Sequence, residues 1–209
     1  MRPDNFINSL SGGLEPIREL AMRLRSSGSD VTNDMVALSN RPNIAPQAYA
    51  MRAFAPLTAG AIDRYQRLRG VTISAHYRPV IGQLNGLEAF KFSLYGIPPS
   101  MVTDPPMLDR SKAQPYDIGT AEQSWKREYD IPAAWFHFGG APYSFDENMG
   151  YFFAPSGIIH ASRKNGEVLR TWTSFQQFLS DELRRAEADF PAYEVRIAEL
   201  MASNVTSKS

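Results

Sequence analysis

Residues 158–172 read IIHASRKNGEVLRTW, and this stretch decides the class of fold. Its two halves, 158–163 and 167–172, contain apolar and β-branched residues and flank the letters KNG at 164–166. Asn-Gly between two apolar runs is the strongest short-range hairpin signal, because a type I′ turn needs positive φ at both of its central residues. The stretch therefore predicts two antiparallel strands joined by a type I′ turn.

More strands are expected on the N-terminal side of this hairpin. Apolar runs at 134–138 and 150–154 are each bounded by glycine or proline, as strands usually are. In 89–95 every second residue from Phe90 onward is apolar, which is the pattern of a strand with one buried face. The C-terminal half of the chain is therefore predicted to be mostly antiparallel sheet.

Helices are expected on both sides of these strands, where a capping residue precedes apolar residues at helical spacing. The predicted helices cover 14–24, 58–69, 75–84 and 117–129, and a final one begins after Ser174. A further short helix, through residue 38, is predicted from capping by Asp30 or Thr32. Pro191 is expected to interrupt the final helix, because proline removes a backbone donor and clashes with the preceding turn.

The order of these elements indicates an α+β fold, in which helices pack against an antiparallel sheet, or a mixed one, of about five or six strands. Three regions are expected along the chain. Residues 1–56 form a helical N-terminal extension with a proline-containing linker, and the chain is irregular or extended from residue 41. Residues 57–190 form the main domain, and residues 191–209 form a helical piece with a frayed tail.

Composition excludes several classes of protein. The chain has 209 residues, of which 43% are hydrophobic, and this is enough apolar material for a sizeable core. No cysteine is present, so disulfides, thiolate metal ligands and cysteine nucleophiles are excluded. We expect no membrane span, no secretory signal and a cytoplasmic location. The tryptophans, Trp125 and Trp135 among them, are expected in the core, because lysine and arginine are not interleaved with them.

Basic and acidic residues balance at 22 each, so the net charge is zero and general affinity for nucleic acid is not expected. The charges are nevertheless unevenly spread along the chain. Residues 60–80 are basic, with Arg64, Arg67 and Arg69, whereas residues 117–150 are acidic. The acidic residues expected to contact a partner are Asp117, Glu122, Asp130, Asp146 and Glu147.

Known catalytic motifs are missing from the sequence. It contains no phosphate-binding G-x-x-x-x-G-K-[ST] loop, no G-x-S-x-G elbow and no H-E-x-x-H helix. The three histidines are His76, His137 and His160. The last two, with an acid such as Asp146, make a conceivable metal site, but a sheet histidine bonded to backbone or water is the commoner arrangement. We therefore expect no catalytic residue, no metal and no cofactor.

Six segments occur in a recognisable order along the chain. They are IDRYQRLRGV at 62–71, SAHYRPVI at 74–81, LNG at 84–86, LYGIP at 94–98, GYF at 150–152 and the last predicted strand leading into 174–183. Together they resemble the Smi/Knr branch of the SUKH superfamily, over about residues 57–188. Two positions depart from the family's pattern, since Ser74 replaces the usual proline and Gln66 the usual acid.

What the resemblance implies is binding rather than catalysis. Many bacterial members of the superfamily are thought to be immunity proteins, which bind and block a cognate toxin domain that is often a nuclease. The leading prediction is therefore a non-catalytic protein-binding module whose partner is a cognate toxin. The acidic stretch would suit a basic nuclease by steering association. Two alternatives stay open: a regulatory scaffold that docks proteins through residues 1–56, and a metal-dependent hydrolase that uses His137, His160 and nearby acids.

Overall fold

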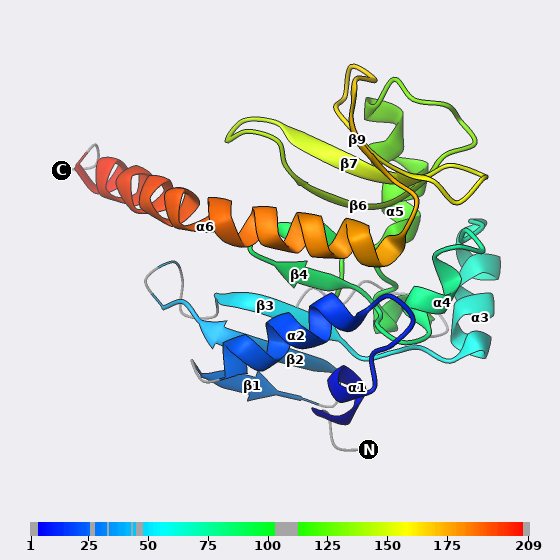
Figure 1. The fold of residues 1–209 in the computed structure, drawn as a ribbon, viewed down its shortest axis with the longest axis horizontal. Helices are drawn as coiled ribbons and strands as arrows, with labels where there is room; N and C mark the ends of the chain where they lie inside the picture. The colour runs from blue at the N-terminus through cyan, green and yellow to red at the C-terminus, as the bar shows by residue number, and fades with distance from the viewer. Residues whose placement is uncertain are drawn as a thin grey trace.

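The computed structural model describes residues 4–25, 28–32, 34–42, 44, 48–102 and 113–206. Within these residues one antiparallel sheet contains nine strands, and each strand pairs with the next one along the chain (Figure 1). The strands are β1 (Ser29–Val31), β2 (Met35–Asn40), β3 (Tyr49–Phe54), β4 (Leu87–Ala89), β5 (Phe92–Leu94), β6 (Phe136–Pro142), β7 (Asn148–Phe153), β8 (Ile159–Ser162) and β9 (Val168–Trp172). The α+β class is confirmed, and the sheet has more strands than the five or six that the sequence predicts.

Two helices cover one face of this sheet. The α-helices are α1 (Asp4–Asn8), α2 (Glu15–Leu24), α3 (Ala59–Arg69), α4 (Arg78–Ile81), α5 (Ile118–Gln123) and α6 (Phe175–Thr206), and the 3₁₀-helices are η2 (Pro99–Val102) and η3 (Trp125–Glu128). The helix α2 packs on β2 and β3, and α6 packs on β4, β5 and β9 (Figure 1). They also contact each other, whereas α5 contacts β6. Within the described residues, no helix has both the length and the apolar character needed to cross a membrane.

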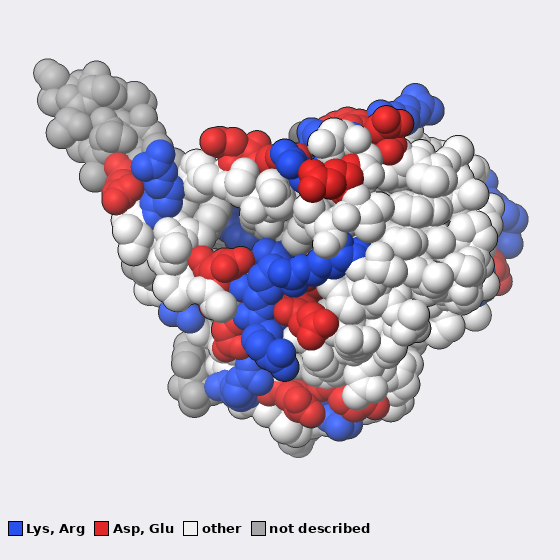
Figure 2. Space-filling model, turned by 45° about the horizontal axis from the view of Figure 1, so that its top comes forward, with Lys and Arg blue, Asp and Glu red and all other residues white. Residues whose placement is uncertain are grey.

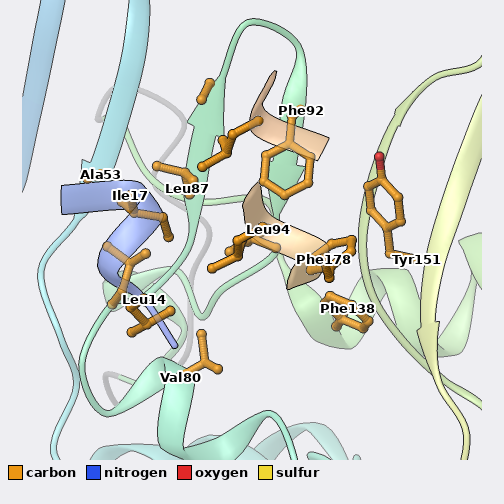
Figure 3. Close-up of a cluster of buried hydrophobic side chains, with 14 of the residues drawn as sticks. Leu14, Ile17, Ala53, Val80, Leu87, Phe92, Leu94, Phe138, Tyr151 and Phe178 are labelled. Carbon is orange, nitrogen blue, oxygen red and sulfur yellow. The ribbon is translucent and has the colours of Figure 1, made fainter. Parts of the chain in front are cut away.

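The core lies between the sheet and the helices α2 and α6. Figure 3 shows Ile17 of α2, Phe92 of β5, Phe138 of β6 and Phe178 of α6 in one buried cluster. The Phe178 ring centroid lies 5.5 Å from that of Phe138 and 5.8 Å from that of Phe92. Burial of each such side chain stabilises the fold by about 1.5–3 kcal/mol. Because β3 pairs with β4 and α2 joins this cluster, residues before 57 share one sheet and one core with the residues that follow.

The short helix predicted after Asp30 or Thr32 is wrong, because this segment forms the antiparallel pair of β1 and β2. Thr32 N donates to Met35 O at 2.9 Å and closes the connection between the two strands. Residues 35–39 are all buried. A strand buried on both faces presents a continuous apolar run, which lacks the alternation that distinguishes a strand from a helix. The strand β3 likewise occupies part of the stretch predicted to be irregular or extended.

The single strand predicted over 89–95 is instead the hairpin of β4 and β5. Its two turn residues, Phe90 and Lys91, have φ of 49° and 75°, as the central residues of type I′ turns have. The Phe90 ring lies 5.3 Å from that of Phe190, and Lys91 Nζ lies 4.5 Å from the centre of the Tyr193 ring. Contacts with α6 therefore hold a turn whose positive φ values neither residue favours by itself.

The hairpin predicted at 158–172 is confirmed, with β8 and β9 as its strands, but its turn is of another type. Within this fully described turn, positive φ occurs only at Gly166, where it is 83°. Gly166 N donates to Arg163 O at 3.0 Å. This is the pattern of a type I turn followed by a glycine bulge, which is the next most common hairpin connection.

The predicted helix over 58–69 is confirmed as α3, which begins at a cap and ends at a glycine. The Thr58 side chain accepts from Ala61 N at 3.2 Å, and Gly70 ends the helix with φ of 61°. The hydroxyl and the left-handed glycine satisfy backbone groups that a helix leaves free at its ends. The helix predicted over 75–84 is confirmed only in its central turn, α4.

The final helix, α6, does not stop at Pro191. It runs continuously from Phe175 to Thr206, so the predicted interruption is wrong. Phe190 and Tyr193, on either side of the proline, pack against the β4–β5 turn. These contacts offset the backbone hydrogen bond that proline removes.

Candidate functional site

Residues of the LNG and LYGIP segments hold each other in place beside β5. Asn85 is buried, and its side-chain amide donates to Ile97 O and accepts from Ile97 N, both at 2.8 Å. A Cβ at Gly96 would lie 2.2 Å from Asn85 O, so only glycine fits there. Tyr77 Oη donates to Tyr95 O at 2.7 Å. These contacts fix the chain at Tyr95, whose ring lines the cavity described next.

A cavity of about 450 Å³ lies over β5, β6 and β7, on the sheet face opposite the core. We call it the aromatic trough, because one wall consists of Tyr95, Tyr116, Trp125 and Tyr129. The rings meet edge to face, and the Tyr95 centroid lies 5.4 Å from that of Trp125 and 6.1 Å from that of Tyr116. Edge-to-face contact is a favourable geometry for aromatic pairs, so these rings support one another without a ligand.

The floor of the aromatic trough is made of backbone and small residues. Ser93 of β5 pairs with Gly140 of β6. A Cβ at Gly140 would lie 2.6 Å from Tyr95 Oη, so glycine at this position makes room for the Tyr95 hydroxyl. The pairing of β6 with β7 shifts register between His137 and Gly139, and such a bulge bends a strand and redirects its side chains.

His137 lies at the back of the aromatic trough and is 1% exposed. Its ring stacks on Phe152 with centroids 4.5 Å apart, and the Tyr129 ring meets its edge at 5.4 Å. Neither ring nitrogen makes a hydrogen bond with a described side chain. Burial lowers the pKa of His137 to about 4, although backbone hydrogen bonding with Ala121 and Gly139 opposes this shift. The imidazole is therefore neutral at pH 7.

Charged groups at the rim of the aromatic trough are paired or lie on rings. Lys164 Nζ lies 2.6 Å from Glu128 Oε2, and Lys91 Nζ lies over the Tyr193 ring. Burial raises the pKa of Tyr95 and raises the pKa of Tyr129 to about 12, so both hydroxyls stay protonated at pH 7. The trough thus combines aromatic walls with neutral hydrogen-bonding groups.

A second cavity, of about 490 Å³, adjoins the aromatic trough. It lies between α6 and the tips of the β4–β5 and β6–β7 hairpins, and we call it the α6 groove. Phe90 and Phe190 form part of its wall. On the β6–β7 tip, Tyr143 is 45% exposed and Phe145 is 47% exposed. The guanidinium carbon of Arg196 lies 5.4 Å from the centre of the Phe145 ring, so the groove has an aromatic lip with a cation beside it.

Of the acids predicted to bind a partner, Asp117 has the most contacts within the fold. It is the N-cap of α5 and accepts hydrogen bonds from the Tyr65 hydroxyl and, at 2.6 Å, from Thr120 Oγ1. Arg69 Nη2 lies 3.1 Å from Oδ2, the same carboxylate oxygen that accepts from Thr120. Burial and the neighbouring carboxylate raise the pKa of Tyr65. The Asp117 carboxylate therefore joins α3 to α5 and is not a free surface charge.

The other four predicted acids lie on separate elements. Glu122 of α5 lies 2.5 Å from Lys126 Nζ, and Glu147 lies 2.8 Å from Arg163 Nη2. The hydrogen bonds from Arg163 hold the pKa of Glu147 below its usual value. The remaining two are exposed in loops, and they are Asp130 and Asp146. Three of the five acids are therefore neutralised locally by basic side chains or helix-cap donors.

The two strand histidines do not converge on one point. In the ladder His137 pairs with Phe152, which in turn pairs with His160, so a phenylalanine stands between them. His160 stacks on Trp135 with centroids 4.1 Å apart. Among the described residues no group of three or more histidine, aspartate or glutamate side chains is placed to hold a metal ion. The predicted combination of His137, His160 and Asp146 is therefore not formed in this structure.

The sequence analysis missed the aromatic trough. Trp125 was expected in the core, but it is only partly buried and lines the trough. Trp135 is also only partly buried, beside His160. The available signal was the position of Tyr95 and Tyr116, each next to a glycine or proline where an element ends. Aromatic residues at such points are positioned by the scaffold and remain accessible.

Comparison with known proteins gives no match: no family model, no curated protein and no solved structure matches the chain. The SUKH resemblance therefore stays a prediction.

Proposed function

We propose that this chain is a non-catalytic protein-binding module, and that it serves as an immunity protein which binds and neutralises a cognate bacterial toxin in the cytoplasm. The observation that carries the proposal is the exposed aromatic lip of the α6 groove. Tyr143 and Phe145 are each nearly half exposed at a hairpin tip, above the buried rings of Phe90 and Phe190 in the groove wall. Exposed aromatic side chains beside a groove are characteristic of interaction sites.

The composition of this surface matches that of binding hot spots. Protein interfaces are enriched in tyrosine, tryptophan, phenylalanine and arginine, and a few such residues supply most of the binding energy. Around the α6 groove, Tyr143 and Phe145 occur together with Arg185, Tyr193 and Arg196. Rings held by cations, such as Phe145 beside Arg196, lose little conformational freedom when a partner binds.

The charges of the groove favour one kind of partner. Its lining contains Lys91, Arg185 and Arg196 and one acid, Asp189. Arg185 pairs with Asp189 at 3.1 Å and Arg196 pairs with Glu199 at 3.3 Å, so carboxylates of a partner would replace these exposed acids. Figure 2 shows the molecule obliquely from the side of α6, where basic side chains form a band with acidic groups on both sides. A toxin segment with apolar side chains and flanking carboxylates is complementary to this lining. The proposed partner surface is therefore acidic, whereas the acidic stretch at 117–150 predicts a basic one.

The positions of the resemblance segments also support the proposal. The segment at 62–71 lies in α3, and Tyr77, Asn85 and Gly96 brace the chain around β5. Tyr77, Asn85 and Gly96 have structural roles here, and none of the three needs to act in catalysis. They provide a rigid platform, which is what an inhibitor needs to keep a partner's active site blocked.

The proposal requires a gene near that of this chain to encode a toxin domain, and the test is whether the chain neutralises that domain. Co-expression of the two should restore growth, and the purified proteins should form a complex. Replacing both Tyr143 and Phe145 by alanine should weaken that complex by at least about 100-fold, since each hot-spot residue contributes about 2 kcal/mol. Val168→Ala is the matched control, because Val168 is 45% exposed on β9, outside the groove.

Charge reversal separates the two candidate surfaces. If the α6 groove binds an acidic segment, Arg196→Glu should weaken the complex and Asp146→Lys should not. The reverse result would assign binding to the acidic residues and reject the groove. Absence of complex formation and of growth rescue by the unaltered chain would reject the immunity role itself.

A further inference from the structure

We propose that the aromatic trough is a second binding site, and that its ligand is a neutral sugar ring, such as a hexopyranose unit of a glycan. The trough shares Phe145 with the lip of the α6 groove, but its wall of Tyr95, Tyr116, Trp125 and Tyr129 does not line that groove, so this inference does not depend on the toxin proposal. Its volume of about 450 Å³ falls within the range of about 300–1,000 Å³ that small-molecule sites occupy.

The walls favour a ligand with apolar flat faces. Tyr95, Tyr116, Trp125 and Tyr129 present ring surface along one side, and Phe145 lies on the other. Tyr116 is 50% exposed, so the wall is open to solvent and accessible to a ligand. The C–H faces of a pyranose ring bury apolar area against such rings in the way that other apolar groups do.

The polar groups that line the trough call for hydrogen-bonding groups at the ligand's edges. The hydroxyl-bearing residues Ser93, Tyr95 and Tyr129 all line it. A sugar hydroxyl both donates and accepts, as do the hydroxyls of these three residues, whereas a purely apolar ligand would leave them without a partner. Asn148 places a further polar group along the trough.

The charges argue against an ionic ligand. The acid lining the trough, Glu128, is paired with Lys164 at 2.6 Å, so a cation would find no unpaired carboxylate. The basic lining residues are Lys164 and Lys91, and Lys91 lies on the Tyr193 ring. No arginine lines the trough, so a bidentate site for phosphate is not formed by these residues. A neutral ligand rich in hydroxyl groups is the class that remains.

Nuclear magnetic resonance titration tests this assignment on the full chain. The probes are cellopentaose, maltopentaose, xylopentaose and chitopentaose, with tetramethylammonium, inorganic phosphate and adenosine as competing chemistries. At least one oligosaccharide should shift the Trp125 indole and His137 imidazole resonances and leave Trp172, which is buried beneath α6, unchanged. Probe concentrations up to about 10 mM are sufficient, because a site with a Kd of about 1 mM would then be mostly filled.

Variants locate the binding and keep the test independent of folding. Trp125→Ala should weaken oligosaccharide binding at least tenfold, and Tyr129→Phe, which removes only a hydroxyl, should weaken it severalfold. Tyr143→Ala should bind the oligosaccharide as the unaltered chain does, because Tyr143 does not line the trough. Tighter binding of tetramethylammonium, phosphate or adenosine, or no shift with any oligosaccharide, would overturn the assignment. So would oligosaccharide binding that Trp125→Ala and Tyr129→Phe both leave unchanged.

Discussion

Both faces of the sheet are rich in aromatic residues, but the polar atoms of these residues have different hydrogen-bond partners on the two faces. On the core face, Tyr151 Oη donates to Glu182, and Trp172 Nε1 donates to Asp181 at 3.0 Å. On the opposite face, the His137 ring stacks on Phe152 and lies beside the backbone of Ala121 and Gly139, and the described residues give its nitrogens no side-chain partner. Buried polar atoms on the core face are therefore held by charged side chains, whereas those of His137 are not.

The largest effect is expected on the core face, at Glu182. This carboxylate is fully buried and lies 2.9 Å from Arg185 Nη2 and 3.2 Å from Arg170 Nη1. Glu182→Ala leaves Arg185 without its buried partner, and we expect the free energy of unfolding to fall by about 3–5 kcal/mol. Urea denaturation measures this change.

Glu187→Ala is the control for Glu182→Ala. Glu187 is on the same helix and pairs with Arg23 at 2.7 Å, but both side chains are about half exposed. Surface pairs contribute about 0–1 kcal/mol, so the control should change stability by no more than that. Equal effects of the two substitutions would show that the Glu182 network does not hold α6 to the sheet.

Acidification should lower the free energy of unfolding, because His137 on the opposite face is buried in its neutral form. The folded pKa of about 4 lies below the usual value of 6.5, so the unfolded chain binds a proton that the folded chain excludes. The stability that the neutral imidazole provides is complete above pH 6.5 and is lost as pH falls towards 4. The loss attributable to this group is about 3 kcal/mol.

The quantity to compare is the loss of unfolding free energy on acidification, measured for the unaltered chain and for His137→Phe. The comparison is needed because carboxylates titrate near the same pH in both proteins. Unfolding in urea at pH 7 and at pH 4.5 should show a smaller loss in the variant, which keeps the stack on Phe152. His160→Gln is the control, because burial lowers the pKa of His160 less extensively at its more exposed site. An unchanged pH dependence in His137→Phe would contradict the prediction.

The smallest effects on stability are expected when a tyrosine is replaced by phenylalanine. Because the same substitution can be made on each face of the sheet, it compares the two faces directly. Tyr151→Phe removes a hydroxyl that contacts Glu182 and Arg185, and we expect a loss of about 1.5–3 kcal/mol, as for hydrogen bonds to charged groups. Tyr129→Phe removes a hydroxyl that has no such partner, and we expect a change within about 0.5 kcal/mol. Thermal unfolding measures both changes in stability. Similar losses from the two substitutions would contradict the proposed difference between the two faces.

The elements that the sequence predicted correctly are those with local causes. The hairpin of β8 and β9 follows from Asn165-Gly166, and α3 follows from Thr58 and Gly70. The errors occur where distant contacts decide the structure. The Phe90 turn and the continuous α6 depend on each other across about 100 residues, and no local pattern records that contact.

The difference between local causes and distant contacts also explains how much of the candidate site could be predicted from the sequence. Charge clustering along the chain identified Asp117 and Glu147, but not their pairing with Arg69 and Arg163, which come from other elements. The aromatic trough is lined from the C-terminal end of β5, the segment around Tyr116, the helix η3 and the strand β6, so its members are far apart in sequence. Linear spacing carries no information on such a site.

The neighbour-to-neighbour order of the nine strands has a consequence for synthesis on the ribosome. Because each described strand pairs with the one before it, the sheet can grow as each new segment emerges, with no need to wait for a distant partner. The helix that completes the core is made last, and it closes against α2, which is made early. Until α6 has left the exit tunnel, the nascent chain therefore presents an apolar sheet face that a ribosome-associated chaperone would have to shield.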